Sequence, residues 1–138
     1  MANLYNSEGY FSPTEFAAFT RIEKAEKEAA YRPVVYICSP YSGDTERNIE
    51  NAKKYSRFAV DRNYLPITPH IYFTQFMDDE IPEERNTAIF MNRVLLSKCV
   101  ELWVFGSVIS RGMKGEIKRA KRKHLKIRYF TEEMEETT

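Results

Sequence analysis

The sequence has few histidines and cysteines, and it has no apolar run long enough to span a membrane. No uninterrupted apolar segment approaches the roughly 18 residues that a spanning helix needs, so we expect no membrane partner. The two histidines and two cysteines have no metal-ligand spacing, and we expect no metal. No Gly-x-Gly-x-x-Gly follows the first apolar run, so we expect no dinucleotide and no other cofactor. Cys38 and Cys99 both lie in apolar runs, which favours buried free thiols.

The sequence also lacks a strong net charge. It has 21 Lys and Arg residues against 20 Asp and Glu residues, so no overall field attracts nucleic acid or a membrane surface. The basic run at 114–126 is typical of a solvated helix face and is balanced by acidic stretches, so we do not expect a nucleic-acid partner. The chain begins MANLYNSEGYF, without the basic and apolar segments of a secretory signal, and the expected location is cytoplasmic.

The composition that is present fits one packed domain. The 138 residues are 43% apolar and 14% aromatic, which is enough for one hydrophobic core and too short a chain for two ordinary domains. We expect a loosely ordered N-terminal arm and a helix over residues 1–32, a single domain over 33–131, and an acidic tail over 132–138.

The chain is organised around Val34 to Gly43, which reads VVYICSPYSG. Five apolar, β-branched or aromatic residues are followed by Ser, Pro and Gly, a pattern that predicts a buried strand running into a tight loop. Asp44 then opens a helical pattern, so this segment is the first half of a βαβ unit. The loop lies at the carboxyl end of a parallel strand, where open α/β sheets bind ligands.

Apolar runs and helical patterns alternate along the rest of the chain. Ser12-Pro13-Thr14-Glu15 predicts the start of a helix that ends near Ala30, with Ser as the cap and Pro at the first position. The further expected elements are a strand over 64–68, a loop or short helix over 70–81, a helix over 82–99, a strand over 101–106, a helix ending near 124 and a strand over 125–130.

This alternation predicts an α/β fold of the Rossmann-like or flavodoxin-like type. We expect a three-layer sandwich whose four-stranded parallel sheet has the order 2-1-3-4, with an extra N-terminal helix. The loops at 39–44 and 107–112 then face each other across one crevice at the switch point between the first and third strands.

The helix expected at 82–99 is apolar on more than one face from residue 88 onward. Its apolar residues there are Ile89, Phe90, Met91, Val94, Leu95 and Leu96. A helix apolar nearly all round is covered by the sheet on one side and by something else on the other. We therefore expect a homodimer or a larger assembly with this helix in the interface.

The second crevice loop leads from Ser110 into a helix that carries Glu116. Gly112 lets the backbone approach a ligand closely, and the helix N-terminus offers free N–H groups. We expect Glu116 in roughly the first turn, where the helix dipole helps to keep it ionised. Such a carboxylate is a candidate nucleophile toward an anomeric carbon; the alternative is a glutamate that is simply favourable early in a helix.

Two motifs together carry a resemblance to a known group. VVYICSPYSG at the first strand and S-x-G-M-x-x-E-x-x-x-A after the third resemble the nucleoside 2-deoxyribosyltransferase-like superfamily. The similarity covers residues 33–130 and is strongest to a short bacterial branch of unknown function with a like CSPYSGD stretch and LWVFG strand. The superfamily includes transferases that exchange bases on deoxyribose and hydrolases that split deoxynucleotides at the N-glycosidic bond.

The resemblance implies roles for individual residues. Glu116 matches the nucleophile, Tyr36 the tyrosine near that carboxylate, and Ser110 and Gly112 the loop that contacts the sugar or phosphate. The expected partner is a small-molecule nucleoside or nucleotide. The substrate-binding residues that we expect around the crevice are Ser39, Ser42, Gly43, Asp44, His70, Asn92, Ser110, Gly112 and Met113.

Two positions depart from the superfamily's pattern. Asn92 stands where the transferases place an aspartate, and Ser42 stands where the nucleotide hydrolases carry an arginine. These departures keep a second function open, a nucleotide-binding sensor of the same fold without turnover. Asp44 is either a second carboxylate or a helix cap, and His70 either reaches the crevice rim or makes a structural hydrogen bond.

Overall fold

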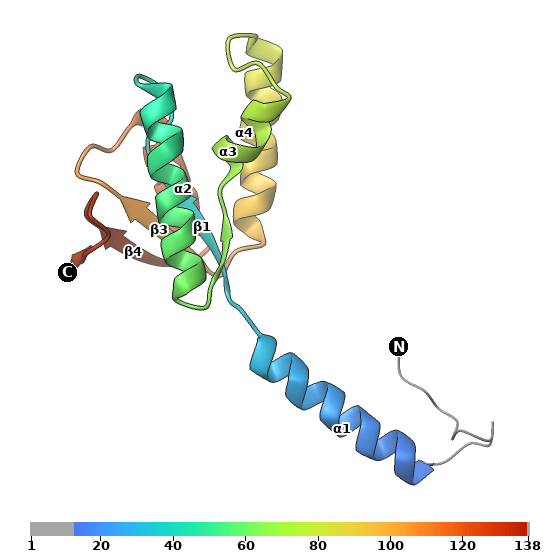
Figure 1. The fold of residues 1–138 in the computed structure, drawn as a ribbon. Helices are drawn as coiled ribbons and strands as arrows, with labels where there is room; N and C mark the ends of the chain where they lie inside the picture. Colours follow the sequence, from blue (N-terminus) through green and yellow to red (C-terminus); the bar gives the residue numbers. More distant parts are fainter. Residues whose placement is uncertain (1–12, 138) are drawn as a thin grey trace. The chain divides into compact units, whose positions relative to one another are not determined.

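The computed structural model describes residues 13–137, apart from the side chains of residues 28 and 29 (Figure 1). The chain divides into two compact units, Met1–Arg32 and Pro33–Thr138. The expected loose arm at 1–11 and the expected capping residue Ser12 lie outside the described residues.

The first unit contributes helix α1, Pro13–Ala30. Pro13 occupies the first turn, where its missing N–H costs nothing, and Glu15 places a carboxylate near the positive end of the helix dipole. Phe19 and Ile22 remain exposed on this helix. The predicted N-terminal helix is therefore present with the predicted end.

The second unit is built on a five-stranded sheet with the order β2-β1-β3-β4-β5. The strands are β1 Val34–Cys38, β2 Leu65–Ile67, β3 Glu101–Phe105, β4 Lys126–Phe130 and β5 Glu136–Thr137. The pairs β1–β2, β1–β3 and β3–β4 are parallel, whereas β5 pairs antiparallel with β4. The predicted α/β class is confirmed, but the sheet is mixed and five-stranded rather than purely parallel and four-stranded.

The fifth strand forms because the segment assigned to an acidic tail turns back on the sheet. Met134 adopts a left-handed conformation with φ 66°, and the Thr131 N–H donates to the Glu135 carbonyl. Arg128 then donates two hydrogen bonds, of 2.8 and 2.7 Å, to the Glu136 carboxylate. This bidentate pair joins the neighbouring strands β4 and β5 and stabilises β5. A strand of two residues is too short to be predicted from apolar periodicity.

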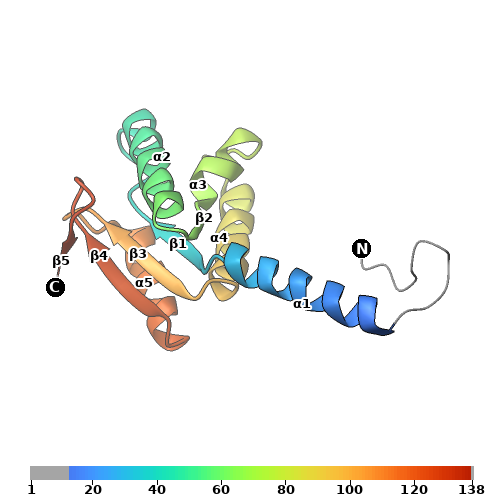
Figure 2. The same ribbon diagram turned by 60° about the horizontal axis from the view of Figure 1, so that its bottom comes forward.

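Helices cover both faces of the sheet (Figure 2). They are α2 Thr45–Asp61, α3 Pro69–Tyr72, the 3-10 helix η1 Phe73–Gln75, α4 Pro82–Ser97 and α5 Arg111–Arg122. Alternate residues of β1 and β3 point to opposite faces, as the period of a strand requires. Val35 and Ile37 pack with Tyr55 and Ala59 of α2, whereas Tyr36 belongs to the cluster that includes residues of α4 and α5. The result is three layers with two apolar clusters.

The switch point of the sheet lies between β1 and β3, which are paired in parallel with Tyr36 opposite Leu102. The chain leaves β1 toward β2 on one side and leaves β3 toward β4 on the other. The loops after β1 and β3 therefore diverge at the same edge of the sheet, which is where such sheets hold ligands.

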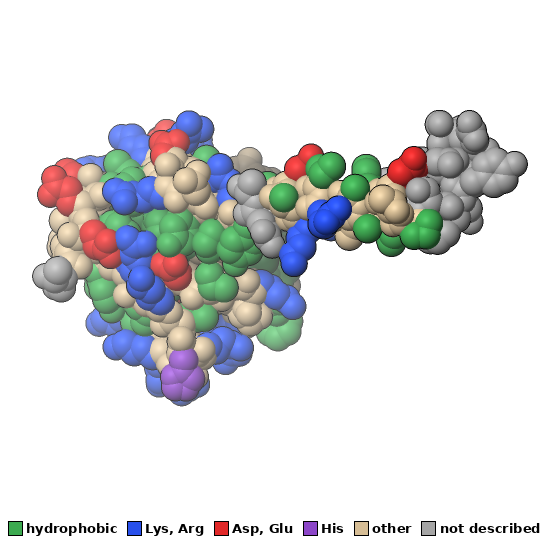
Figure 3. All heavy atoms as spheres, turned by 90° about the horizontal axis from the view of Figure 1, so that it is seen from below, with side chains coloured by type: hydrophobic (Ala, Val, Ile, Leu, Met, Phe, Trp, Pro, Cys, Tyr) green, Lys and Arg blue, Asp and Glu red, His purple; other side chains and the backbone are tan. Residues whose placement is uncertain are grey.

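Within residues 13–137, no helix has the length and apolar character needed to cross a membrane. On the face drawn in Figure 3, acidic and basic side chains are interspersed with apolar ones.

Candidate functional site

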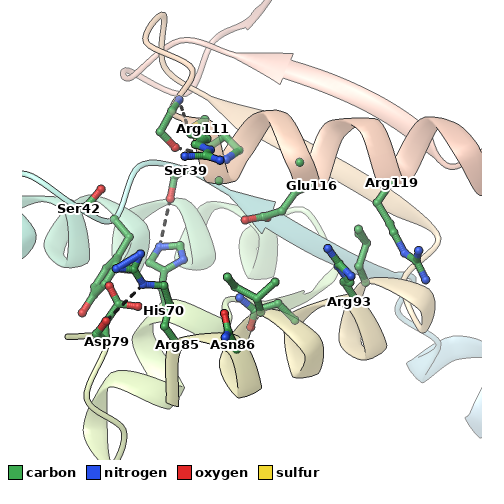
Figure 4. Close-up of a pocket in the computed structure, with 18 residues that line it drawn as sticks. Ser39, Ser42, His70, Asp79, Arg85, Asn86, Arg93, Arg111, Glu116 and Arg119 are labelled. Carbon is green, nitrogen blue, oxygen red and sulfur yellow. Dashed lines mark hydrogen bonds between the residues drawn. The ribbon is translucent and has the colours of Figure 1, made fainter. Parts of the chain in front are cut away.

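A cavity of about 840 Å³ opens at the carboxyl edge of the sheet, between α4 and α5 (Figure 4). Its walls come from the β1–α2 loop, α3, the segment before α4, and the facing sides of α4 and α5. The lining residues are Ser39, Tyr41, Ser42, His70, Asp79, Arg85, Asn86, Ile89, Asn92, Arg93, Leu96, Ser110, Arg111, Gly112, Met113, Gly115, Glu116 and Arg119. Seven of the nine expected substrate-binding residues and Glu116 are thus brought together: Ser39, Ser42, His70, Asn92, Ser110, Gly112 and Met113.

Helix α5 begins earlier than the sequence pattern suggests. Ser110 is its cap, and the Ser110 hydroxyl accepts a hydrogen bond of 3.3 Å from the Met113 N–H. Because a capping serine starts the helix at the next residue, Gly112 and Met113 occupy the first turn and Glu116 the second. The expectation that Glu116 lies in the first turn is therefore wrong, and the dipole, which acts within the first turn, is not its main influence.

The Glu116 carboxyl projects from α5 into the cavity (Figure 4) and is deeply desolvated. Burial raises the pKa of Glu116 to about 7, although hydrogen bonds from Tyr36 and Cys38 act in the opposite direction. Its Oε2 is buried and has no hydrogen-bond partner among the described residues. At neutral pH about half of the Glu116 carboxyl groups are ionised. The helix dipole, which was expected to help keep Glu116 ionised, therefore does not outweigh its burial.

Tyr36 and Cys38 lie beneath Glu116 rather than in the cavity wall. Both side chains are buried on the α5 face of β1, and neither lines the cavity. Burial and the nearby Glu116 carboxylate raise the pKa of the Tyr36 hydroxyl and of the Cys38 thiol, so both keep their protons and act as donors. The sequence pattern points to Tyr36 as a site residue and indicates only a buried thiol at Cys38. The position of Cys38 two residues after Tyr36 places both side chains on the same face of β1.

His70 takes both of the roles that the sequence left open. It lines the cavity, and its Nε2 lies 3.3 Å from the Ser39 hydroxyl oxygen. Burial lowers the pKa of His70 to about 4, so the ring is neutral at physiological pH. The Tyr41 ring lies 5.9 Å from the His70 ring, and Ser39, Tyr41 and His70 form one wall of the cavity.

Gly43 and Asp44 are not among the cavity-lining residues. Gly43 has φ 100°, a conformation that favours glycine, and turns the chain into α2. Asp44 caps that helix, because its Oδ1 accepts a hydrogen bond of 3.3 Å from the Arg47 N–H. The Asn48 side chain donates to the carbonyls of Tyr41 and Ser42, which ties the loop to α2. Of the two roles considered for Asp44, the structure gives it the cap.

Asn92 and four arginines are among the polar residues of the α4 and α5 walls. Asn92 Oδ1 is buried and has no hydrogen-bond partner among the described residues. Arg85 and Arg93 come from α4, and Arg111 and Arg119 from α5. These arginines were not among the expected site residues, although their spacing of eight residues on each helix puts each pair near one face.

The chain belongs to a family defined by its sequence rather than by an activity. The model of the family described as "Domain of unknown function (DUF7768)" matches residues 33–130, which run from the start of the second unit to the last residue of β4. A search of curated proteins found no match. Among the described residues, no group of three or more His, Cys, Asp or Glu side chains is arranged to hold a metal ion.

Proposed function

We propose that the protein cleaves or transfers at the N-glycosidic bond of a deoxyribonucleoside or its monophosphate, with Glu116 as the nucleophile. The observation that carries this proposal is the placement of the Glu116 carboxyl. It projects into a large cavity, its Oε2 has no hydrogen-bond partner among the described residues, and Tyr36 and Cys38 donate hydrogen bonds to the carboxylate. Such a carboxyl has a free lone pair aimed at a ligand and a protonation state that changes near neutral pH.

The reaction proceeds in two displacements. The ionised Glu116 oxygen attacks the anomeric carbon as the carbon–nitrogen bond breaks, and the base leaves with the bonding electrons and takes up a proton. Water, or an N–H nitrogen of a second base, then attacks the same carbon, gives up one proton to solvent, and releases the Glu116 carboxylate. The oxocarbenium character of both transition states is stabilised by the negative charge of the carboxylate.

The roles of the neighbouring residues follow from their places. Tyr36 and Cys38 hydrogen-bond to Glu116 from below and act as positioning residues, because they do not line the cavity. Ser110, Gly112 and Met113 line the cavity at the start of α5, where they contact the sugar or its substituents.

The protein is also proposed to act as a cytoplasmic homodimer or larger assembly with a small-molecule nucleoside or nucleotide as its partner. Phe90 and Val94 stay exposed on α4 and do not line the cavity, which supports an interface on this helix. The three-layer, Rossmann-like arrangement, with its cavity at the sheet's switch point, supports a nucleotide-sized ligand.

A second function is favoured by Asn92. With an amide in place of the transferases' aspartate, and Ser42 in place of the hydrolases' arginine, the same cavity binds a nucleotide as a signal without turning it over.

Base release from deoxyribonucleosides and their monophosphates, followed by chromatography, tests the proposal with the wild type and Glu116→Gln. The amide keeps the shape and loses the nucleophilic charge, so release is expected to fall by roughly 1,000-fold or more while ligand binding survives. Measurable binding without release by the wild type would assign the protein to the sensor class.

A further inference from the structure

Arg93 and Arg119 line one end of the cavity, on facing helices. Figure 4 shows both arginines on the side of Glu116 away from Ser39 and His70. Arg119 follows Glu116 on α5, whereas Arg111 precedes it at the start of the helix. The cavity therefore has guanidinium groups beyond Glu116 as well as at the entry to α5.

At this end of the cavity Arg119 has a buried donor without a partner, whereas Arg93 is solvent-exposed. Arg119 Nε is buried and has no hydrogen-bond partner among the described residues, and the same is true of Asn92 Oδ1 on the α4 wall of the same cavity. Among the ion pairs of residues 13–137, none involves Arg93 or Arg119. A buried donor of a charged group without a partner is costly, and two like charges that line one cavity repel each other. An anion bound by both guanidinium groups gives the buried Arg119 Nε an acceptor and weakens the repulsion between the two charges.

Arg119 is not occupied in neutralising Glu116. The influences on the Glu116 carboxyl are its burial and its hydrogen bonds from Tyr36 and Cys38, and no ion pair of the described residues joins Glu116 to Arg119. The guanidinium therefore remains available to a ligand.

The spacing suits one sugar phosphate. Glu116 and Arg119 are three residues apart on α5, so they share a helix face and are separated by a rise of about 4.5 Å. With the anomeric carbon at Glu116, a phosphate on the same sugar comes within reach of the Arg119 side chain. The planar guanidinium forks of Arg93 and Arg119 match phosphate oxygens bidentately.

We propose that Arg93 and Arg119 form the phosphate subsite of this cavity, so that its ligand is a nucleotide rather than a bare nucleoside. The placement of the sugar rests on the proposed function, whereas the binding of the phosphate does not require Glu116 to react. The positive charge that the hydrolases place in the first loop is supplied here from α4 and α5, which accounts for a serine at position 42.

Calorimetric titration of the full-length protein tests this subsite. The probes are the four common deoxynucleoside 5′-monophosphates, the matching nucleosides and inorganic phosphate. The best-bound monophosphate is expected to bind about tenfold or more tightly than its nucleoside. Arg93→Gln and Arg119→Gln each remove most of this difference and leave nucleoside affinity within about twofold. Arg119→Lys, which keeps the charge but loses the fork, gives an intermediate loss.

Two further variants make the result specific. Arg122→Gln removes the same charge from the same helix outside the cavity, and it is expected to retain the full difference between monophosphate and nucleoside. Arg111→Gln, at the entry to α5, is expected to retain most of it. A single cooperative melting transition, at or above the melting temperature of the wild type, establishes that each variant is folded.

The outcomes separate this subsite from the proposed chemistry. Tight binding of a monophosphate that depends on Arg93 and Arg119, without base release, supports the subsite and refutes the N-glycosidic reaction. Three results would overturn the subsite. The first is that only Arg111→Gln loses the difference in affinity between monophosphate and nucleoside. The others are equal affinities for the two in the wild type, or no binding of any phosphate probe.

Discussion

The Tyr36 hydroxyl, which is buried and does not line the cavity, donates a hydrogen bond to the Glu116 carboxylate, which projects into it. Tyr36 comes from β1 and Glu116 from α5, so the contact joins the first strand of the sheet to the helix that follows the third. The hydrogen bond favours the ionised form of Glu116, whereas burial favours the neutral form, and the balance leaves the pKa of Glu116 at about 7. The nucleophile in the proposed reaction is therefore only partly charged at neutral pH.

The first prediction concerns the pH dependence of base release. Only the ionised Glu116 attacks, so the rate under subsaturating substrate is expected to rise about tenfold from pH 6 toward a plateau above its pKa of about 7. His70 stays neutral over this range because burial lowers its pKa to about 4. A rate that is flat between pH 6 and 8 would show that this carboxylate does not limit the reaction.

Tyr36→Phe is expected to shift the pH profile of base release to higher pH. Removing a hydrogen bond to a charged group costs about 1.5 kcal/mol or more, which raises the pKa of Glu116 by about one unit. Base release at pH 7 therefore falls several-fold and recovers near pH 9. Cys99→Ser is the control, because Cys99 is buried in the same apolar cluster and exerts no influence on the Glu116 pKa. A uniform loss at every pH would indicate a packing role for Tyr36 instead.

The third prediction links Glu116 to stability. Its pKa in the folded protein, about 7, lies above the ordinary value of 4.5, so the folded state binds the proton more tightly. The contribution of this group is fully present below about pH 4.5 and is lost as the pH rises through about 7. Relative to the wild type, Glu116→Gln is therefore expected to gain about 3 kcal/mol of stability between pH 4.5 and 8.

Urea unfolding of both variants across this pH range measures the gain. His70 titrates in the opposite sense between about pH 6.5 and 4, but it is present in both proteins and its effect cancels in the comparison. Glu133→Gln, a change at an exposed turn, is the matched control and should show no such gain. A difference between the Glu116 variants that does not change with pH would contradict the linkage.

The fourth prediction concerns assembly. Phe90 is 65% exposed on α4, one helical turn before the exposed Val94. Phe90→Glu places a charge in this apolar surface and is expected to convert a homodimer at micromolar concentration to a monomer, as measured by light scattering. Phe76→Glu is the control, because Phe76 is similarly exposed, at 60%, but lies after η1. A wild-type protein that is monomeric at these concentrations would refute the interface.

Local signals in the sequence determined most of the elements. Pro13 and Glu15 mark the beginning of α1, and the apolar run from Val34 to Cys38 matches β1 residue for residue. Asp44 begins α2 because its side chain satisfies a free backbone N–H, which is a contact between neighbours in the chain. The alternation of such elements also determined the α/β class, since parallel strands require crossover helices.

The tertiary structure alone decided the properties of the site. The pKa of Glu116 depends on burial and on two donors from β1, and the arginines share one cavity only because α4 and α5 pack with particular faces toward each other. Strand β5 is stabilised by the contact between Arg128 and Glu136, and its two residues are too few to show a periodic pattern in the sequence. Desolvation, charge proximity and strand pairing depend on residues that are far apart in the chain. A local pattern can therefore identify candidate side chains, but it does not determine their charge states or their partners.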